Sequence, residues 1–315
     1  MRDTITTVTL NAAIDKTYFV PALVKGTVMR ATEVLSMAGG KGVNVARVLH
    51  QLGHPDVVAT GFAAGHNGRY LVDRIRESGI GADFVVANGE SRLCLNFIDG
   101  VDDSSTEVLE PGPEVEAEHL AALKNKIGGL AERSAVVVLS GSLPRGAPPS
   151  LYAELIELVR AAGALPFLDA SGAPLALGLS AMPAFIKPNE EEILKLLAGN
   201  GDGDLDLREG ALALARQGIR NVVVTLGGEG AAAFVDGVAY RVAIPKLKAV
   251  NTVGCGDAFV AGYAYGSSRG WSAEACLRHA AAAGCANALS AVAGDVKKDD
   301  FDMLLPRISI GEWLK

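Results

Sequence analysis

Residues 135–168, AVVVLSGSLPRGAPPSLYAELIELVRAAGALPFL, contain the alternation that decides the fold. The run Ala135–Leu139 is apolar throughout, which predicts a strand covered on both faces. A helical pattern over Ser150–Ala162 follows, and Leu165–Leu168 predicts the next strand. A strand, a helix and a further strand in this order are typical of a parallel α/β sheet.

The same alternation extends in both directions along the chain. Further strands are predicted at Ile5–Leu10, Val57–Thr60, Ala184–Ile186 and Asn221–Thr225. Helical patterns lie between them, at Val43–Leu52, Gly68–Glu77, Glu116–Leu130, Glu190–Leu197 and Arg208–Gln217. We therefore predict an α/β fold with a doubly wound, mostly parallel sheet and helices on both faces.

Two segments interrupt this rhythm. Lys16–Ser36 and Glu90–Glu110 read as strands and turns with little helix, and we expect them to pair as a small separate β-sheet. The region Asp257–Ala293 reads as two alanine-rich helices separated near Arg269. Because no interdomain linker or internal repeat is evident, residues 1–315 are predicted to form a single domain.

Composition excludes several classes of protein. The 315 residues are 49% hydrophobic and 21% charged, which is ordinary for a globular chain and excludes disordered and collagen-like classes. A net charge of −7 argues against a nucleic-acid partner. We expect no membrane span and no signal peptide. The four cysteines form no C-x-x-C pair, so we expect free thiols and a cytoplasmic location.

A first glycine-rich segment, AGGKGVNVA at residues 38–46, stands between a predicted strand and a predicted helix. Glycines allow close backbone approach to a ligand, and the start of the following helix attracts anions. The segment fits neither the Walker A pattern nor the Rossmann pattern, since Val45 occupies the third glycine position of the latter. It is either an anion site or a simple turn into a helix.

Two more glycine segments follow. In NTVGCGDAF, residues 251–259, the backbone N–H groups of Gly254, Cys255 and Gly256 can converge on an anion. Asp257 is then either a helix cap or a general base beside that anion. In VTLGGEGA, residues 224–231, a strand ends in a glycine turn and a second strand follows. This third segment is either a plain hairpin or a ligand loop at the sheet edge.

Together these segments resemble the PfkB, or ribokinase-like, family of carbohydrate kinases. The first segment resembles the N-terminal signature of the family, and Gly254–Asp257 resembles its C-terminal signature, about 210 residues later. Thr7–Asp15, Ser140–Pro144 and Lys187–Glu192 resemble further family segments. The resemblance covers nearly the whole chain.

Within this family the sequence is most similar to the branch of tagatose-6-phosphate kinase and 1-phosphofructokinase. Lys41, the pair Ser91-Arg92 and the stretch Thr106–Pro113 carry that similarity. Ala12 and Cys255 depart from the residues usual in the branch. The resemblance implies transfer of a phosphoryl group from ATP to a sugar phosphate, with Mg²⁺ and with a monovalent cation such as K⁺ as a further candidate cofactor.

The resemblance also implies roles for individual residues. Asp257 would remove the proton from the attacking hydroxyl, and the Gly254–Gly256 amides would stabilise the transferred group. The residues expected to hold the sugar or its phosphate are Asp15, Gly39, Gly40, Lys41, Asn44, Arg92 and Ser142. Those expected to border the nucleotide are Lys187, Asn189, Thr225, Gly227, Gly230 and Asn287, with Glu192 near Mg²⁺ through water.

The segments near 16–36 and 90–110 would form a lid over the sugar, and an exposed face of this lid would pair two copies as a homodimer. One alternative is a kinase of an unphosphorylated sugar or nucleoside, against which Arg92 and Lys41 argue, since both are cations suited to a phosphate. Another is a non-catalytic sugar-phosphate sensor. Asp257 argues against it, because a sensor needs no base.

Overall fold

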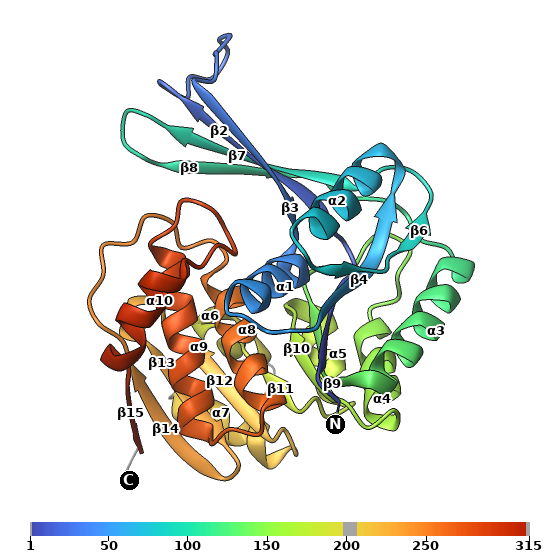
Figure 1. The fold of residues 1–315 in the computed structure, drawn as a ribbon, viewed down its shortest axis with the longest axis vertical. Helices are drawn as coiled ribbons and strands as arrows, with labels where there is room; N and C mark the ends of the chain where they lie inside the picture. The colour runs from blue at the N-terminus through green and yellow to red at the C-terminus, as the bar shows by residue number, and fades with distance from the viewer. Residues whose placement is uncertain (1, 198–206, 313–315) are drawn as a thin grey trace.

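The computed structural model describes residues 2–197 and 207–312, which form two sheets and their flanking helices (Figure 1). In the described residues the main sheet has 11 strands and the order β15-β14-β13-β12-β11-β10-β9-β1-β4-β5, with β6 beside β4. It is parallel from β5 to β12 and antiparallel from β12 to β15. The strands are β1 (Thr4–Thr9), β4 (Val57–Ala64), β5 (Gly81–Ala82), β6 (Val85–Ala87), β9 (Ser134–Ser140), β10 (Leu165–Asp169), β11 (Phe185–Ile186), β12 (Asn221–Thr225), β13 (Ala231–Val235), β14 (Val238–Ala243) and β15 (Ser309–Glu312).

Both faces of this sheet are covered, which explains the apolar runs in the sequence. Val136 and Val138 of β9 belong to one hydrophobic core, and Val137 and Leu139 belong to the other. Successive side chains of a strand point to opposite faces, so every position of the run is buried. The predicted doubly wound, mostly parallel sheet is confirmed.

The helices divide between the two cores (Figure 1). One face carries α1 (Lys41–Gln51), α2 (Gly65–Glu77), α8 (Cys255–Ser268), α9 (Ala273–Ala288) and α10 (Lys298–Leu304). The other face carries α3 (Ala117–Arg133), α4 (Leu151–Ala161), α5 (Gly172–Leu179), α6 (Glu190–Leu197) and α7 (Leu207–Arg216). The two predicted late helices are therefore α8 and α9. Within the described ranges, no helix is long and apolar enough to cross a membrane.

The small sheet has the order β3-β2-β7-β8 and projects beyond the main body (Figure 1). Its strands are β2 (Ala13–Val20), β3 (Glu33–Gly39), β7 (Arg92–Asp99) and β8 (Ser105–Leu109). Strands β2 and β7 pair in parallel, so the two interrupting segments of the sequence meet here as expected. Every residue of the edge strand β8 is exposed.

Several elements were not predicted from the sequence. Helix α5 has the sequence GAPLALGL, whose proline and glycines are unfavourable to a helical reading. The antiparallel strands β14 and β15 come after the regular alternation has ended. β14 and β15 complete the edge of the main sheet but lie outside the strand–helix–strand pattern on which the prediction was based.

Candidate active site

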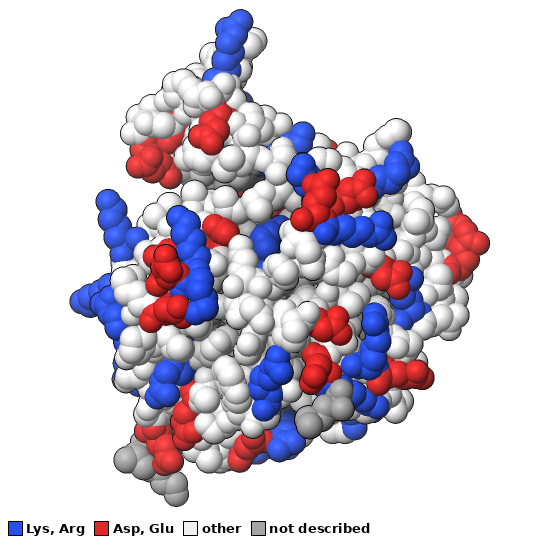
Figure 2. Space-filling view, viewed as in Figure 1, with Lys and Arg blue, Asp and Glu red and all other residues white. Residues whose placement is uncertain are grey.

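A cleft of about 450 Å³ lies at the carboxyl ends of the parallel strands, between the small sheet and the body. Figure 2 shows the molecule hollowed between these two parts, with positive and negative side chains interspersed on this face. Thr17, Leu35 and Leu95 of the small sheet line the cleft from one side, and the start of α8 lines it from another. This is the edge at which open α/β sheets bind ligands.

Two helices begin at the cleft, and each is preceded by a glycine with a positive φ. Gly40, before α1, has φ +97°, and Gly254, before α8, has φ +83°. Neither helix has a side-chain cap at this end. Apart from the Cys255 N–H, the N–H groups in the first turns of both helices are therefore available to an anion. Three N–H groups were predicted from the sequence to bind the anion here. One of them, the Cys255 N–H, instead donates to Thr252 O at 3.3 Å.

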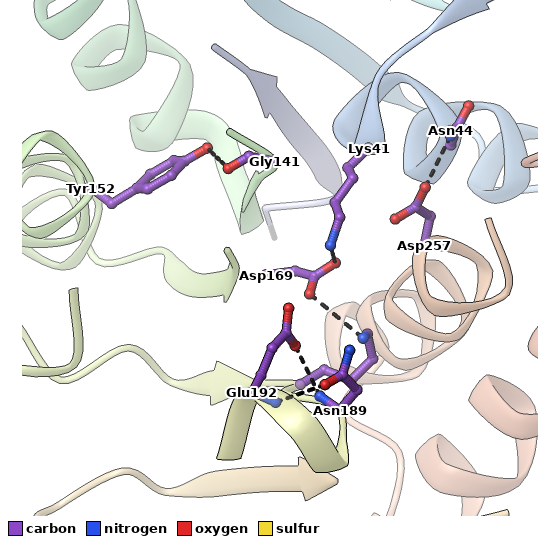
Figure 3. Close-up of polar contacts among 9 residues, drawn as sticks. Lys41, Asn44, Gly141, Tyr152, Asp169, Asn189, Glu192 and Asp257 are labelled. Carbon is purple, nitrogen blue, oxygen red and sulfur yellow. Dashed lines mark hydrogen bonds and ion pairs between the residues drawn. The ribbon is translucent and has the colours of Figure 1, made fainter. Parts of the chain in front are cut away.

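Asp257 lies in the first turn of α8, and only 6% of its surface is exposed. Asn44 of α1 donates from Nδ2 to Asp257 Oδ2 at 2.9 Å (Figure 3). Burial raises the pKa of Asp257 to about 6, although the nearby Lys41 opposes the shift. The carboxylate is thus ionised at neutral pH, but its pKa is high enough for it to take a proton during a reaction.

Asp169, at the end of β10, holds two lysines of the site (Figure 3). Its Oδ2 lies 3.3 Å from Lys41 Nζ, and its Oδ1 lies 3.5 Å from Lys187 Nζ. Burial alone would raise the pKa of Asp169, but the two lysines hold it below its ordinary value. The same pairing raises the pKa of Lys41. Lys41 therefore stays charged, and Asp169 holds the ammonium groups of both lysines beside the cleft.

Asp15, on β2, faces the same cleft and lies against Gly39 of β3. A Cβ on Gly39 would lie 2.1 Å from Asp15 Oδ2, so only glycine leaves room for this carboxylate. Burial raises the pKa of Asp15 to about 6, against the opposing charges of Arg47 and Arg92. The open side of Gly39 is thus filled by Asp15, which corrects the expectation that a sugar lies directly against this glycine.

A smaller pocket of about 210 Å³ adjoins the cleft, and Lys41 and Arg92 line both. Ser142 lines only the smaller pocket. In the described part of the chain, three of its polar side-chain atoms are buried without a hydrogen-bond partner, and these are Thr9 Oγ1, Asn11 Oδ1 and Ser140 Oγ. These atoms are enclosed by the protein and do not open into the pocket: Thr9 Oγ1 packs against Gly42, and Asn11 Oδ1 packs against Gly112.

The loop that borders the smaller pocket is held from beneath. Tyr152 of α4 is fully buried, and its hydroxyl donates to Gly141 O at 3.0 Å (Figure 3). The Gly141 N–H donates to Asp169 O at 3.0 Å. These two bonds fix the peptide next to Ser142 and tie it to the strand that carries Asp169.

On the other side of the cleft, Asn189 and Glu192 cap the start of α6. Asn189 N–H donates to Glu192 Oε2 at 2.9 Å, and Glu192 N–H donates to Asn189 Oδ1 at 2.8 Å (Figure 3). No group of three or more potential metal ligands occurs in residues 2–197 and 207–312. The donor set fits Mg²⁺ held by one or two carboxylates together with phosphates, not a cage of protein ligands.

The comparison with protein families decides the identity of the fold. A model described as pfkB family carbohydrate kinase matches residues 8–298. The chain belongs to the pfkB family of carbohydrate kinases. It is thus a phosphotransferase with an alcohol group as acceptor.

Relatives of this pfkB kinase cover almost its whole length. Tagatose-6-phosphate kinase from Staphylococcus epidermidis is 36% identical over 98% of this chain and 99% of its own length. A putative phosphofructokinase from Staphylococcus aureus is 30% identical, with a TM-score of 0.84 over 98% of both chains. Phosphofructokinase-2 from Escherichia coli, in complex with fructose-6-phosphate, is 26% identical, with a TM-score of 0.88 over 96% of this chain and 98% of its own. The same protein in complex with potassium gives a TM-score of 0.89 over the same shares of the two chains.

Most residues singled out in the sequence of this pfkB kinase line the cleft. They are Asp15, Gly40, Lys41, Asn44, Arg92, Lys187, Asn189, Glu192, Thr225, Gly254, Gly256 and Asp257. Segments far apart in the chain are therefore brought to one place. Gly227 and Gly230 do not line it: they form the turn of the β12–β13 hairpin, where a Cβ on Gly230 would lie 2.0 Å from Val242 O.

Asn287 is the clearest correction. Its side chain is fully buried, and Nδ2 donates to Val253 O at 2.9 Å while Oδ1 accepts from Gly294 N–H at 2.7 Å. An amide enclosed in this way does not reach a nucleotide, so it supports the loop before α8 instead. Cys255 likewise faces away from the cleft, with Sγ near Asn287 Nδ2 at 3.4 Å.

Sequence reasoning missed three residues that contribute to the site. Asp169 directly follows a predicted strand, and a carboxylate at the carboxyl end of a parallel strand is a usable signal. Arg47 lies three residues after Asn44 on the same helix, where side chains face the same side. Asn11, in the smaller pocket, donates from Nδ2 to Pro111 O at 3.2 Å, a contact between segments that no local pattern reveals.

Proposed function

We propose that this pfkB kinase uses ATP to phosphorylate a ketohexose phosphate, tagatose 6-phosphate or fructose 1-phosphate, to the bisphosphate. The observation that carries the proposal is the position of Arg92 and Lys41, which line both the cleft and the smaller pocket. Two cations at this junction suit a phosphate that the substrate already carries. The names of the tagatose-6-phosphate kinase relative and of the complex with fructose-6-phosphate support this substrate class.

The phosphate-bearing end of the substrate occupies the smaller pocket. Arg92 donates from Nε to Asn11 O at 3.0 Å, which fixes the arginine while its terminal nitrogens remain near the pocket. The hydroxyl of the exposed Ser142, which lines this pocket, supplies a donor for phosphate oxygens.

The reacting hydroxyl lies beside Asp257. The carboxylate takes the proton of this hydroxyl as the oxygen attacks the γ-phosphate, and the N–H groups of Gly254 and Gly256 donate to the transferred group. Asn44 holds Asp257 from the side, and Asp15 accepts from other sugar hydroxyls. One donor to the developing charge contributes roughly 2.7–4 kcal/mol in comparable anion holes.

The nucleotide lies on the opposite side of the cleft. Lys187, Asn189 and Thr225 border its phosphates, and Glu192 would help to hold Mg²⁺. The metal supplies charge neutralisation to the triphosphate. A potassium requirement is part of the proposal, supported by the related phosphofructokinase-2 complex with potassium.

The small sheet acts as a lid, and through it two copies form a homodimer. Its inner side contributes Thr17, Leu35 and Leu95 to the cleft, so a bound sugar is covered and water is excluded. On β8, Val108 is 52% exposed and lines neither the cleft nor the smaller pocket, which suits pairing with a second copy; Leu109 lines both.

An ADP-release assay with Mg-ATP tests this proposal. The acceptors are tagatose 6-phosphate, fructose 1-phosphate, fructose 6-phosphate, fructose and ribose, each with and without KCl. We expect turnover on phosphorylated ketohexoses, with the highest kcat/KM naming the substrate. Arg92→Met should raise KM for these acceptors much more than KM for ATP. Turnover on fructose or ribose alone would contradict the proposal, and a chain that binds sugar phosphate without turnover would be a sensor.

A further inference from the structure

Arg47 is a cation of the cleft to which none of the steps above gives a role. It lies on α1 and lines the cleft. Its Nη1 donates to Asn44 Oδ1 at 3.1 Å and to Ala293 O at 2.9 Å, and its Nη2 donates to Ala38 O. One guanidinium thus joins three parts of the chain: the end of β3, the amide of Asn44 and the loop after α9.

The contact with Asn44 determines which way that amide points. A guanidinium has only donors, so the end of the amide that faces Arg47 must be the oxygen. The NH₂ end then faces Asp257, whose ionised carboxylate only accepts. With the amide reversed, both contacts would be repulsive. Arg47 therefore sets the orientation in which Asn44 donates to the proposed base.

The contact with Ala293 has a second consequence. Gly294, the next residue, packs so closely that a Cβ on it would lie 2.8 Å from Asn44 Cβ. A Cβ on Gly254, at the start of α8, would lie 2.6 Å from Gly294 N. The loop is therefore wedged between the sugar side and the anion-binding side of the site. Two hydrogen bonds hold this loop: Arg47 of α1 donates to Ala293 O, and Asn287 of α9 accepts from Gly294 N–H.

Arg47 also contributes charge. It is the largest of the influences that oppose the rise in the pKa of Asp15, and Arg92 and the thiol of Cys94 also face that carboxylate. Around Asp257 the charged groups are Lys41, Asp169, Lys187 and, beyond the Asn44 amide, Arg47. Arg47 additionally faces Asp295. Loss of the Arg47 charge should therefore change the pKa of Asp15 most.

We propose that Arg47 is a positioning residue for phosphoryl transfer, because it fixes the Asn44 amide toward Asp257 and holds the loop that spaces α1 from the start of α8. The proposal rests on the roles of Asn44 and Asp257 in the proposed function. It adds a residue that acts on the reaction through these two and through the loop, without contacting the reacting atoms.

The test compares Arg47→Lys, Arg47→Met and the matched control Gln51→Leu. Gln51 lies one turn later on α1 and anchors the same loop, donating to Asp295 Oδ1 at 2.8 Å, but it makes no hydrogen bond to Asn44. Both Arg47 variants should lower kcat by roughly 10- to 100-fold, since each loses the guanidinium that bonds Asn44 and Ala293 together. Gln51→Leu should lower kcat much less than either Arg47 variant, because it removes a support of the loop but leaves the Asn44 amide oriented by Arg47.

The pH profile separates positioning from general damage. In Arg47→Met the pKa of Asp15 should rise, since a positive charge beside this carboxylate has been removed. The acid limb of the kcat/KM profile should therefore shift to higher pH by about one unit. In Arg47→Lys the limb should stay near its wild-type position while kcat remains low. An unchanged kcat and limb in Arg47→Met, or the same shift in Gln51→Leu, would overturn the proposal.

A double-mutant comparison keeps the test decisive where Arg47→Met fails to fold. In an Asn44→Ala background, Arg47→Lys should lower kcat by much less than in the wild type, because the amide that it orients is gone. An equal effect in both backgrounds would contradict the role through Asn44. The assays use whichever acceptor of the panel turns over fastest, so they remain valid if the hexose-phosphate assignment itself fails.

Discussion

The carboxyl edge of the main sheet and the small sheet differ in how far their side chains are buried. At the edge of the main sheet Asp169, Lys187 and Asp257 are at most 6% exposed, and each has a charged or amide partner at a defined distance. In the small sheet every residue of β7 is only partly buried, and every residue of β8 is exposed. The chemistry is thus built where two hydrophobic cores fix the strands, and the cover is built where little core restrains it.

The difference extends to how the contacts are made. Contacts in the cluster join residues far apart in the chain: 128 positions separate Lys41 from Asp169, and 213 separate Asn44 from Asp257. The small sheet is held mainly by backbone pairing between neighbouring strands. We therefore expect substitutions in the cluster to change kcat, and substitutions in the small sheet to change substrate affinity and assembly.

The largest effect is expected from Asp257→Asn. An amide cannot take the proton of the attacking hydroxyl, so kcat should fall by about 10²- to 10⁴-fold while sugar-phosphate affinity changes little. The ADP-release assay gives kcat, and isothermal titration calorimetry gives the affinity. Asp295→Asn is the matched control, since that carboxylate bonds to Ser290 and Gln51 outside the cleft. A turnover unchanged by Asp257→Asn would remove this residue from the mechanism.

The pH dependence of kcat should be the next largest effect. Burial places the pKa of Asp257 at about 6, so the carboxylate is ionised above this pH and protonated below it. Activity should be flat near pH 8 and lost as pH falls through 6, by about tenfold per unit well below the pKa. Initial rates at saturating substrate between pH 5 and 8.5 measure this. A rate that rises on acidification would show that the base has been misassigned.

A charge on the small sheet should have a more moderate effect. Val108→Asp places a carboxylate on the exposed edge strand β8, away from the Asp169 cluster. Under the proposed pairing it should dissociate the homodimer and raise KM for the sugar phosphate by about tenfold, with kcat little changed. Light scattering and steady-state kinetics check both results. Glu33→Gln, on the opposite edge strand β3, is the control. A dimer that survives Val108→Asp would place the interface elsewhere.

The smallest effect is expected from Tyr152→Phe. This change removes only the hydroxyl that donates to Gly141 O, so the loop bordering the smaller pocket loses one support. A single neutral hydrogen bond contributes about 1 kcal/mol, so KM for the sugar phosphate should rise about fivefold while KM for ATP stays constant. Parallel titrations of the two substrates measure the two constants. Equal changes in both would mean that the hydroxyl supports the whole site and not this pocket.

The sequence predicted the fold and most of the cleft because both rest on local signals. An apolar run identifies each buried strand, and a glycine with an acidic neighbour identifies the start of α8. Asn287 was placed wrongly because an amide on a late helix reads the same whether it faces a ligand or a neighbouring loop. Its burial arises from the packing of α8 against α9, which the sequence does not display. Asp169 was missed because its partners come from other strands and helices.

The strand order of the main sheet also bears on the order in which the strands can pair while the chain is being synthesised. From β9 onward, each new strand is added beside the one made just before it, ending with β15 at the edge. The growing sheet can therefore extend as the chain leaves the ribosome, with few long loops to close. The contacts of α1 with later segments, such as the Asn44–Asp257 bond, form later, because α1 must wait for α8. A nascent chain should thus form most of the sheet well before it acquires any catalytic capacity.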